Sequence, residues 1–208
     1  MKAHTKETQA TMTPEKSLQF LKTGNLRFQN NLKANRNLLE QVNDTSEGQF
    51  PFATILSCID SRVSAELIFD QGLGDIFSIR IAGNFVNEDI LGSMEFASKL
   101  AGTKLIVVLG HTSCGAVKGA CDHARMGNLT ALINKIEPAV EAIKEPKDES
   151  LRNSGNLEFV DNVATENVHL ALENIRKNSP ILLEMEINNE IMIVGGMYNV
   201  STGEVVFF

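Results

Sequence analysis

One apolar run is followed within five positions by a thiol, a carboxylate and a guanidinium. The run "FATILS" (52–57) ends directly before Cys58, and Asp60 and Arg62 come next. A thiolate is a nucleophile and a metal ligand, and a carboxylate paired with a guanidinium is ionised and held in one orientation. Such groups at the end of a buried strand indicate a functional site at the edge of a sheet.

A second reactive group, "GHTSCG", follows the apolar run 104–110 and places His111 and Cys114 three residues apart. The pattern does not fit a phosphate-binding loop, because no Lys-Ser/Thr pair follows Gly115. A thiol nucleophile with His111 as its base remains open, since the base of such an enzyme need only lie beside the sulfur in space. That interpretation gives Cys58 no role.

A metal site uses all three side chains. Cys58, His111 and Cys114 offer two thiolates and one imidazole, which suit zinc, and three protein ligands leave a fourth position open, as in catalytic zinc sites. A single cysteine is more often a small core residue, but three ligands at two predicted strand ends favour a metal. Cys121 lies seven residues after Cys114 and is expected to belong to the core. No role is assigned to the remaining histidines, His4, His123 and His169.

The elements around these residues predict an α/β fold. We expect a mainly parallel central sheet of about four strands plus an added C-terminal strand, flanked by helices, with an N-terminal helical arm that begins at Pro14. Strands are expected at 52–57, 76–83 and 104–110 and in the closing segment 191–208. Helices are expected at 64–75, 88–102, from 115 through a kink at Pro138, at 157–177 and after Ser179. Because parallel strands end at one edge, Cys58 and His111 should meet there.

Composition narrows the class of protein. The chain has 208 residues and a net charge of -7, which argues against a nucleic-acid partner. No apolar run approaches the roughly 20 residues of a membrane span. Residues 1–13 are polar and predicted to be a disordered arm, 14–208 to be a single domain, and 36–50 to be rich in loops. Since the first residues lack the apolar middle of a signal peptide, we expect a cytoplasmic protein, or a periplasmic one if a leader was removed.

The two reactive groups resemble the β-class carbonic anhydrases. The match consists of Cys58-x-Asp60-Ser61-Arg62 followed some fifty residues later by His111-x-x-Cys114-Gly115, with similar segments at "RIAGN" (80–84) and "GGMYNVSTGEV" (195–205). The likeness covers roughly residues 14–208. It implies one zinc ion per chain, held by Cys58, His111 and Cys114, and interconversion of carbon dioxide and bicarbonate.

The resemblance also implies roles for the neighbouring residues. Asp60, paired with Arg62, would accept a hydrogen bond from the zinc-bound hydroxide and orient it toward carbon dioxide. If that pair opened, Asp60 could take the fourth zinc position in a closed form. Gln71 is similar to a glutamine that lines the substrate pocket in plant-type members, and the backbone N–H of Gly115 could face bicarbonate.

One departure concerns a regulatory bicarbonate pocket found in some bacterial members. Arg80 and Tyr198 match two residues of that pocket, but Ile55 stands where its tryptophan would be, and the chain has no tryptophan. The open form of the zinc site is therefore expected.

The resemblance further implies a homodimer or a dimer-based higher oligomer, with active sites at the subunit interface and the helix from Pro14 embracing the partner. Two alternatives remain. The same site could hydrolyse carbon disulfide or carbonyl sulfide, or the chain could be a non-catalytic zinc- or bicarbonate-binding module. An Asp60–Arg62 pair argues against the second alternative, because a structural zinc site needs neither residue.

Overall fold

Strand β3 (Leu105–His111) is buried along its whole length because it runs through the middle of the sheet. The computed structural model describes residues 2–208, and within them the sheet has five strands in the order β2-β1-β3-β4-β5. The others are β1 (Ala53–Ser57), β2 (Ile76–Arg80), β4 (Met192–Tyr198) and β5 (Val205–Phe207). The first four strands are parallel and β5 pairs antiparallel to β4. The predicted fold class is confirmed, including the added C-terminal strand.

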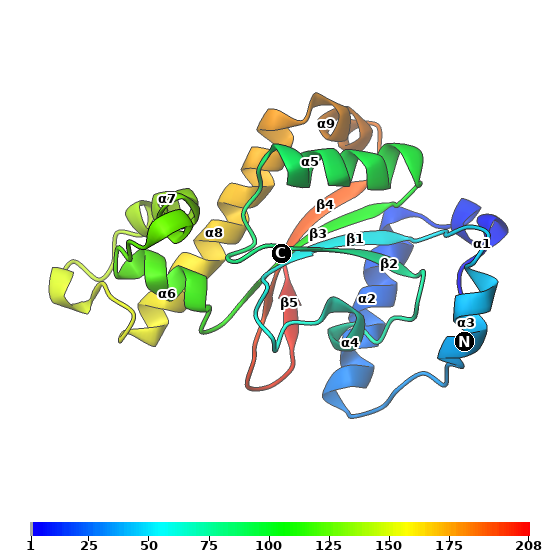
Figure 1. Ribbon diagram of the computed structural model, residues 1–208, viewed down its shortest axis with the longest axis horizontal. Coiled ribbons are helices and arrows are strands. Elements are labelled where there is room, and N and C mark those ends of the chain that lie inside the picture. Colours follow the sequence, from blue (N-terminus) through cyan, green and yellow to red (C-terminus); the bar gives the residue numbers. More distant parts are fainter. Residues whose placement is uncertain (1) are drawn as a thin grey trace.

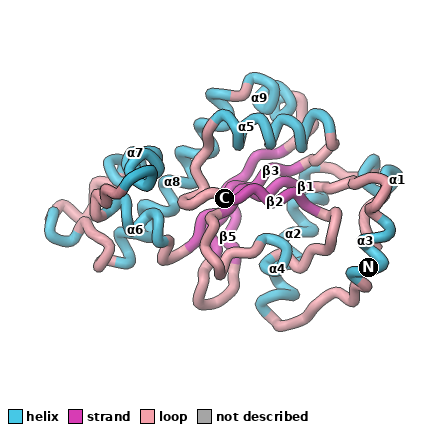
Figure 2. Tube along the Cα trace, in the orientation of Figure 1, coloured by secondary structure: helices cyan, strands magenta, loops and turns pink. Residues whose placement is uncertain are grey.

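Helices cover both faces of this sheet (Figures 1 and 2). One face packs on α5 (Glu88–Glu95), α8 (Leu157–Asn178) and α9 (Pro180–Ile187) through a cluster that includes Leu56, Ile106 and Val108. The other face packs on α2 (Pro14–Gln29) and α4 (Ala65–Ile68). A third apolar cluster joins α6 (Gly115–Cys121), α7 (Gly127–Ala142) and α8 beyond the carboxyl edge. The remaining helical segments are α1 (Lys6–Ala10), α3 (Leu38–Asp44), η1 (Phe96–Leu100) and η2 (Glu149–Leu151).

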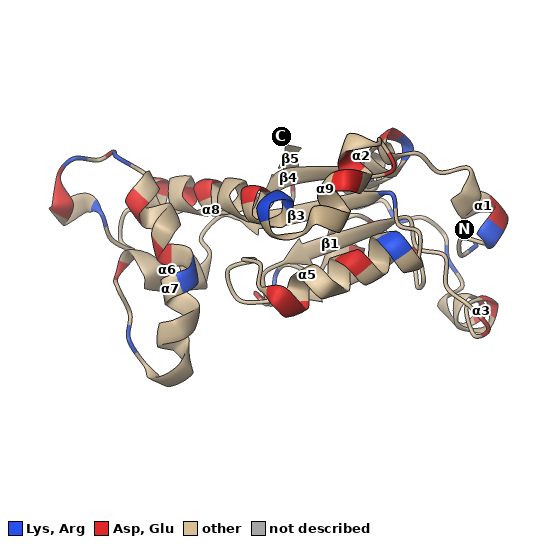
Figure 3. Ribbon diagram, turned by 90° about the horizontal axis from the view of Figure 1, so that it is seen from above, with Lys and Arg blue, Asp and Glu red and all other residues tan. Residues whose placement is uncertain are grey.

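Helix α8 contributes residues both to the cluster that covers the sheet and to the third cluster. Its buried stripe consists of Phe159, Val160, Val163, Ala164, Asn167, Val168, Ala171, Leu172 and Ile175. These positions recur at helical spacing and face the core, and acidic residues recur along the helix between them (Figure 3). Asn156 caps the helix by accepting a hydrogen bond from the Phe159 N–H. Among residues 2–208, no helix combines the length and the apolar character that a membrane crossing requires.

The register of β1 and β3 brings the two reactive groups to one edge of the sheet. Ser57 lies opposite Leu109, so Cys58, the next residue, follows β1 at the level where β3 approaches its last residue, His111. Both strands are buried on both faces, as expected for central parallel strands rich in Ile, Val and Leu. The sheet itself therefore positions the candidate ligands.

The first residues are ordered rather than disordered. Met1 lies outside the described residues, but residues 2–13 contain α1, whose Thr5 and Thr8 form a reciprocal cap. The Gln9 side chain donates hydrogen bonds to the carbonyls of Pro51 (2.7 Å) and Ala101 (2.9 Å), which attaches the segment to the amino-terminal side of the sheet. Such anchoring by a few polar contacts leaves no apolar pattern in the sequence.

Two other local expectations need correction. The polar segment 36–50 contains helix α3, which Asn37 caps by accepting a hydrogen bond from the Glu40 N–H. The helix expected from 115 through Pro138 is two helices, α6 and α7, with a break at 122–126, and Pro138 lies inside α7. The helix from Pro14 is present as α2, and it packs on its own chain, because the backbone of Gly24 lies so close to the Phe69 carbonyl that a Cβ would collide with it.

Asp70 joins α2, the following loop and α4 through a buried network of charges. Its carboxylate accepts hydrogen bonds from Arg27 Nε (2.5 Å), the Ala34 N–H (3.0 Å) and Arg36 Nη1 (2.6 Å). Burial alone would raise the pKa of Asp70, but the hydrogen bonds from Arg27, Ala34 and Arg36 outweigh it, so this pKa lies below its ordinary value.

We expect Asp70→Asn to lower the free energy of unfolding by about 3 kcal/mol at pH 7, because it leaves two arginines without their buried partner. Asparagine tolerates the positive φ of residue 70, so the variant changes mainly the charge. A carboxyl whose folded pKa is depressed stabilises the fold above its unfolded pKa of about 4 and loses that contribution as the pH falls further.

The measurement is urea unfolding of both proteins between pH 7 and pH 3.5. The difference between parent and variant should shrink below about pH 4. Asp148→Asn is the matched control, because that exposed carboxylate bonds within its own turn to Ser150. An equal loss of stability in both variants would contradict the prediction.

Candidate metal centre

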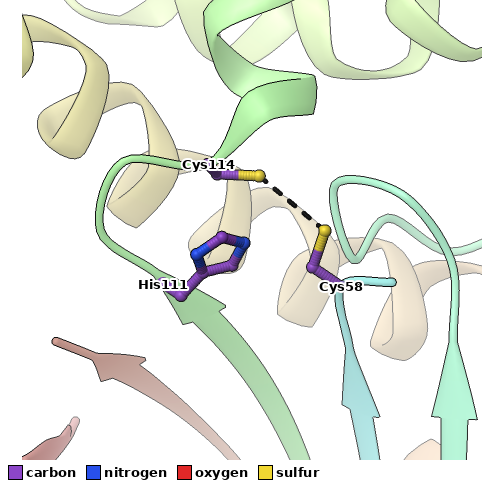
Figure 4. A group of neighbouring side chains, drawn as sticks. All are labelled: Cys58, His111 and Cys114. Carbon is purple, nitrogen blue, oxygen red and sulfur yellow. Dashed lines mark hydrogen bonds between the residues drawn. The ribbon is translucent and has the colours of Figure 1, made fainter. Parts of the chain in front are cut away.

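Cys58, His111 and Cys114 converge at the carboxyl edge of the sheet. Their candidate ligand atoms all lie within 4.8 Å of one another, and the three residues are 3%, 0% and 1% exposed. Figure 4 shows the two sulfur atoms and the imidazole gathered around one point. The sulfurs are 3.9 Å apart, close to the about 3.8 Å that separates two sulfurs bound to one tetrahedral zinc at about 2.3 Å.

Each ligand comes from the end of a strand or the turn after it. Cys58 follows β1, and His111 is the last residue of β3. The chain then turns through Ser113, which has a positive φ of 55°, so that Cys114 becomes the residue before α6. This turn brings the histidine and the second cysteine, three residues apart, to the same side.

The hydrogen bonds of His111 fit a metal ligand. Its Nδ1 lies 3.0 Å from the Thr112 carbonyl oxygen, which can only accept, so Nδ1 carries the proton and Nε2 carries the free lone pair. Nε2 is buried and has no hydrogen-bond partner among residues 2–208. A buried polar atom without a partner is costly. An imidazole fixed through one nitrogen and free at the other, beside two thiols, is the donor set expected for zinc.

The two thiols differ in their acidity. The hydrogen bond from Cys114 lowers the pKa of the Cys58 thiol well below its ordinary value, with a further contribution from the Gly83 N–H. The same interaction with Cys58, together with burial, raises the pKa of Cys114. One thiolate therefore forms readily without a metal, while two adjacent thiolates need a cation between them.

Asp60 and Arg62 form a bidentate pair beside this centre. Arg62 Nε lies 2.9 Å from Asp60 Oδ1 and its Nη2 lies 2.8 Å from Oδ2, while the Arg62 N–H also donates to Oδ1. The hydrogen bond from Arg62 holds the pKa of Asp60 well below its usual range. Asp60 Oδ2 is 4.0 Å from His111 Nε2, so the ionised carboxylate lies next to the ligands.

Comparison with known proteins decides the family. The family profile described as carbonic anhydrase matches residues 53–205, from the start of β1 to the start of β5. The chain belongs to the β-class carbonic anhydrases. Carbonic anhydrase 2 of Mycobacterium tuberculosis is 37% identical over 76% of this chain and 75% of its own length, and the carbonic anhydrase of Mycolicibacterium smegmatis is 32% identical over 92% of both chains. The β-carbonic anhydrase CafA of Aspergillus fumigatus superposes with a TM-score of 0.73 at 26% identity, covering 82% of this chain and 81% of that structure.

Arg80 and Tyr198 of this β-class carbonic anhydrase border the centre in different ways. Arg80 reaches from β2 and donates to the carbonyls of Cys58 (3.0 Å) and Asp60 (2.7 Å), which fixes the turn that carries the first ligand. Tyr198 lies opposite His111 in the sheet, and burial raises the pKa of its hydroxyl. Ile55 is fully buried in the apolar cluster on that face of the sheet.

Of the other two predicted site residues, Gly115 directly follows Cys114, whereas Gln71 lies in a separate cavity. Gln71 donates a hydrogen bond to the Phe69 carbonyl (2.6 Å) and lines a cavity of about 430 Å³ between the end of α2 and α4. The Cys58, His111 and Cys114 side chains do not line this cavity. Gly115 is the first residue of α6, and a Cβ placed on it would meet no atom within 4 Å, so the space in front of this residue is open.

The sequence did not predict the contacts that α8 makes with two loops at the metal centre, the His111–Cys114 turn and the Gly83 loop. Asp161 accepts a hydrogen bond from the Ser113 N–H, and Asn167 donates one to the Gly83 carbonyl. Both residues lie in a long amphipathic helix, where polar residues are common and Asp161 does not stand out. The polar residue Asn167 on the apolar stripe of α8 is the signal that the sequence offers.

The remaining cysteine and histidines lie elsewhere. Cys121 belongs to the apolar cluster of α6 and α7, and burial raises the pKa of its thiol to about 11. The histidines contact other partners: His4 packs on Phe20 and Phe52, His123 faces Glu137, and His169 packs on Phe208.

Proposed function

We propose that this carbonic anhydrase catalyses the reversible hydration of carbon dioxide to bicarbonate and a proton, with one zinc ion held by Cys58, His111 and Cys114. The observation that carries the proposal is the convergence of these ligands at one buried point beside the Asp60–Arg62 pair. A purely structural zinc site needs only its protein ligands. An ionised Asp60 carboxylate oriented by Arg62 beside the ligands is what a hydration reaction requires in addition.

Zinc, when bound, lowers the pKa of water and makes hydroxide available near neutral pH. The protein contributes the orientation of that nucleophile. Asp60 is ionised and held by two hydrogen bonds from Arg62, so it can accept a hydrogen bond from the attacking oxygen and fix the direction of its lone pair. Because Asp60 is engaged by Arg62, we infer that the open form, with Asp60 off the metal, is the resting state.

The walls of the centre suit a small apolar substrate. Phe85 and Val117 belong to the same apolar cluster as Cys58 and Cys114. Carbon dioxide has no hydrogen-bond donor and loses little free energy on leaving water, so apolar walls admit it. Gly115 is the first residue of α6, so its N–H has no partner within the helix and could bind bicarbonate.

The test is a stopped-flow hydration assay on zinc-loaded and metal-free protein, with carbon disulfide hydrolysis measured in parallel. Hydration by the zinc-loaded protein alone supports the proposal. Hydrolysis of carbon disulfide without carbon dioxide hydration would assign the related hydrolase activity instead, and neither activity in a zinc-loaded protein would indicate a non-catalytic binding module.

A homodimer is part of this proposal. Leu32, Leu38 and Leu67 are each more than half exposed and line the cavity that also contains Gln71. Large exposed apolar groups around one cavity are typical of a contact surface. If two chains meet there, Gln71 lies at the interface, where it would reach the substrate of the partner subunit.

We expect Leu67→Glu to dissociate the dimer, because a charge would be buried without a partner in the contact. Light scattering coupled to size-exclusion chromatography should give a monomer mass for this variant. Met126→Glu is the matched control, since Met126 is 70% exposed, Leu67 is 63% exposed, and Met126 lies before α7, away from the cavity. An unchanged mass for Leu67→Glu would place the dimer contact elsewhere.

A further inference from the structure

Asn167 connects helix α8 to the first zinc ligand through one glycine. Its side chain is 3% exposed, and Nδ2 donates a hydrogen bond of 2.7 Å to the Gly83 carbonyl oxygen. The N–H of the same glycine donates to the Cys58 sulfur at 3.4 Å. The carbonyl and the N–H of Gly83 belong to the two peptide units that meet at its Cα, so the bond from Asn167 to the carbonyl helps to keep the N–H directed at the sulfur.

The loop around Gly83 is held by one turn hydrogen bond of its own, from the Asn84 N–H to the Ile81 carbonyl (3.0 Å), and by the contact from Asn167. Gly83 has φ 78° and Asn84 has φ 41°, so two consecutive residues are left-handed. A Cβ on Gly83 would lie 2.4 Å from Ile136 Cδ1, so another residue here would have to displace the Ile136 side chain as well as adopt a left-handed φ. A glycine has more conformational freedom than any other residue, so the buried contact from Asn167 adds to the turn bond in restricting Gly83.

Asp161, also on α8, contacts the turn that carries His111 and Cys114. Its Oδ1 accepts a hydrogen bond of 2.7 Å from the N–H of Ser113, which lies between His111 and Cys114. Ser113 has a positive φ of 55°, an unfavourable conformation for a residue other than glycine. The bond to Asp161 helps to stabilise the turn that brings His111 and Cys114 to the same side.

Helix α8 thus contacts the turn that carries His111 and Cys114, and it contacts the Gly83 loop, which in turn bonds to Cys58. Residues 161 and 167 are six positions apart, about 9 Å along the helix axis. The apolar stripe of α8 packs on the sheet and on the α6–α7 cluster, which prevents the helix from rotating. Helix α8 therefore helps to set the position of the Gly83 loop relative to the turn that carries His111 and Cys114.

We propose that Asn167 and Asp161 are positioning residues of the zinc site, which hold Gly83 and Ser113 so that Cys58, His111 and Cys114 keep a spacing suited to the metal. The inference rests on the proposed zinc-dependent function. Asn167 and Asp161 are not themselves ligands. Asn167 acts through the Gly83 carbonyl and Asp161 through the Ser113 N–H.

A purely structural role for these residues makes a different prediction. Loss of a buried amide lowers the free energy of unfolding wherever it occurs, but it weakens metal binding only if the amide supports the ligands. Asn25 is the matched control, because it is also 3% exposed and donates to two backbone carbonyls, those of Ile68 and Gly203. Unlike Gly83, neither of these residues bonds to Cys58, His111 or Cys114.

The experiment compares zinc affinity, by competition with a chelator, in the parent and four variants: Asn167→Ala, Asn25→Ala, Asp161→Ala and Asp161→Asn. We expect Asn167→Ala and Asp161→Ala to bind zinc about 10- to 100-fold more weakly, the usual effect of removing a group that orients a ligand. Asp161→Asn keeps an oxygen acceptor for the Ser113 N–H and should retain the parent affinity. Asn25→Ala should lose stability and keep its affinity.

A second readout is the thiolate-to-metal charge-transfer absorption of the cobalt-loaded proteins, which should shift in Asn167→Ala and remain unchanged in Asn25→Ala. Equal zinc affinities in the parent and Asn167→Ala, or an equal loss in Asn25→Ala, would overturn the proposal. If Asn167→Ala does not fold, the comparison of Asp161→Ala with Asp161→Asn decides it. A parent protein that binds no zinc would overturn the proposed function itself.

Discussion

Replacing Cys58 and Cys114 together by serine should abolish zinc binding and carbon dioxide hydration while the fold persists. The parent should contain about one zinc per chain. Serine has nearly the size of cysteine, but its hydroxyl does not ionise near neutral pH and does not replace a thiolate ligand. Only His111 would then remain of the three ligands, and one imidazole does not hold zinc against solvent.

Elemental analysis and stopped-flow hydration check this result, and circular dichroism checks that the helices remain. The matched control is Cys121→Ala, which alters the third cysteine inside the same apolar cluster. It should retain both zinc and activity. Zinc retained by the double variant at the parent level would show that the metal site is elsewhere.

Asp60→Asn should lower the hydration rate by about 10²- to 10³-fold, the usual cost of removing one preorganised polar group at a reacting atom, while zinc stays bound. Asparagine has the same shape but no charge. It therefore breaks the bidentate pair with Arg62 and presents a weaker acceptor to the attacking oxygen. Because Arg62 holds the pKa of Asp60 well below its usual range, the carboxylate is ionised throughout the neutral and mildly acidic range.

The sign of the pH effect follows. Asp60 keeps its ionised form above its folded pKa, so its contribution to the rate should disappear only at pH values below those at which ordinary carboxyl groups titrate. The ratio of parent to variant rates, measured by stopped flow at several pH values, should therefore be constant across the neutral range. Asp122→Asn, at the end of α6, is the control and should hydrate at the parent rate. Joint loss of zinc and activity in Asp60→Asn would make Asp60 a metal ligand.

The strands and the three-ligand cluster were predictable because each rests on a short apolar run. Strands β1 and β3 are buried on both faces and read as continuous apolar segments, and parallel strands end at one edge. Cys58 and His111 could therefore be placed together from position alone. Cys114 followed because three residues is a short enough separation to return the chain to the same side.

The contacts that support this cluster were not predictable. Asp161 meets Ser113 across 48 residues and Asn167 meets Gly83 across 84, and no local pattern marks such pairs. Helix α3 and residues 2–13 were missed for a related reason, since polar caps and a few long-range hydrogen bonds hold them. The helical pattern before Pro138 outweighed the breaking effect of that proline, because α7 packs its apolar side on α6 and α8.

The register in which Ser57 pairs with Leu109 has a consequence for how correct folding of the chain can be checked. A slip of β1 by one residue would move Cys58 about 3.3 Å along the strand and turn its side chain to the opposite face of the sheet. Such a chain could still bury most of its apolar residues, yet it would present one cysteine and one histidine instead of three ligands. Metal uptake thus distinguishes a correctly paired sheet from a shifted one, and zinc content reports the fraction of molecules whose strands are aligned.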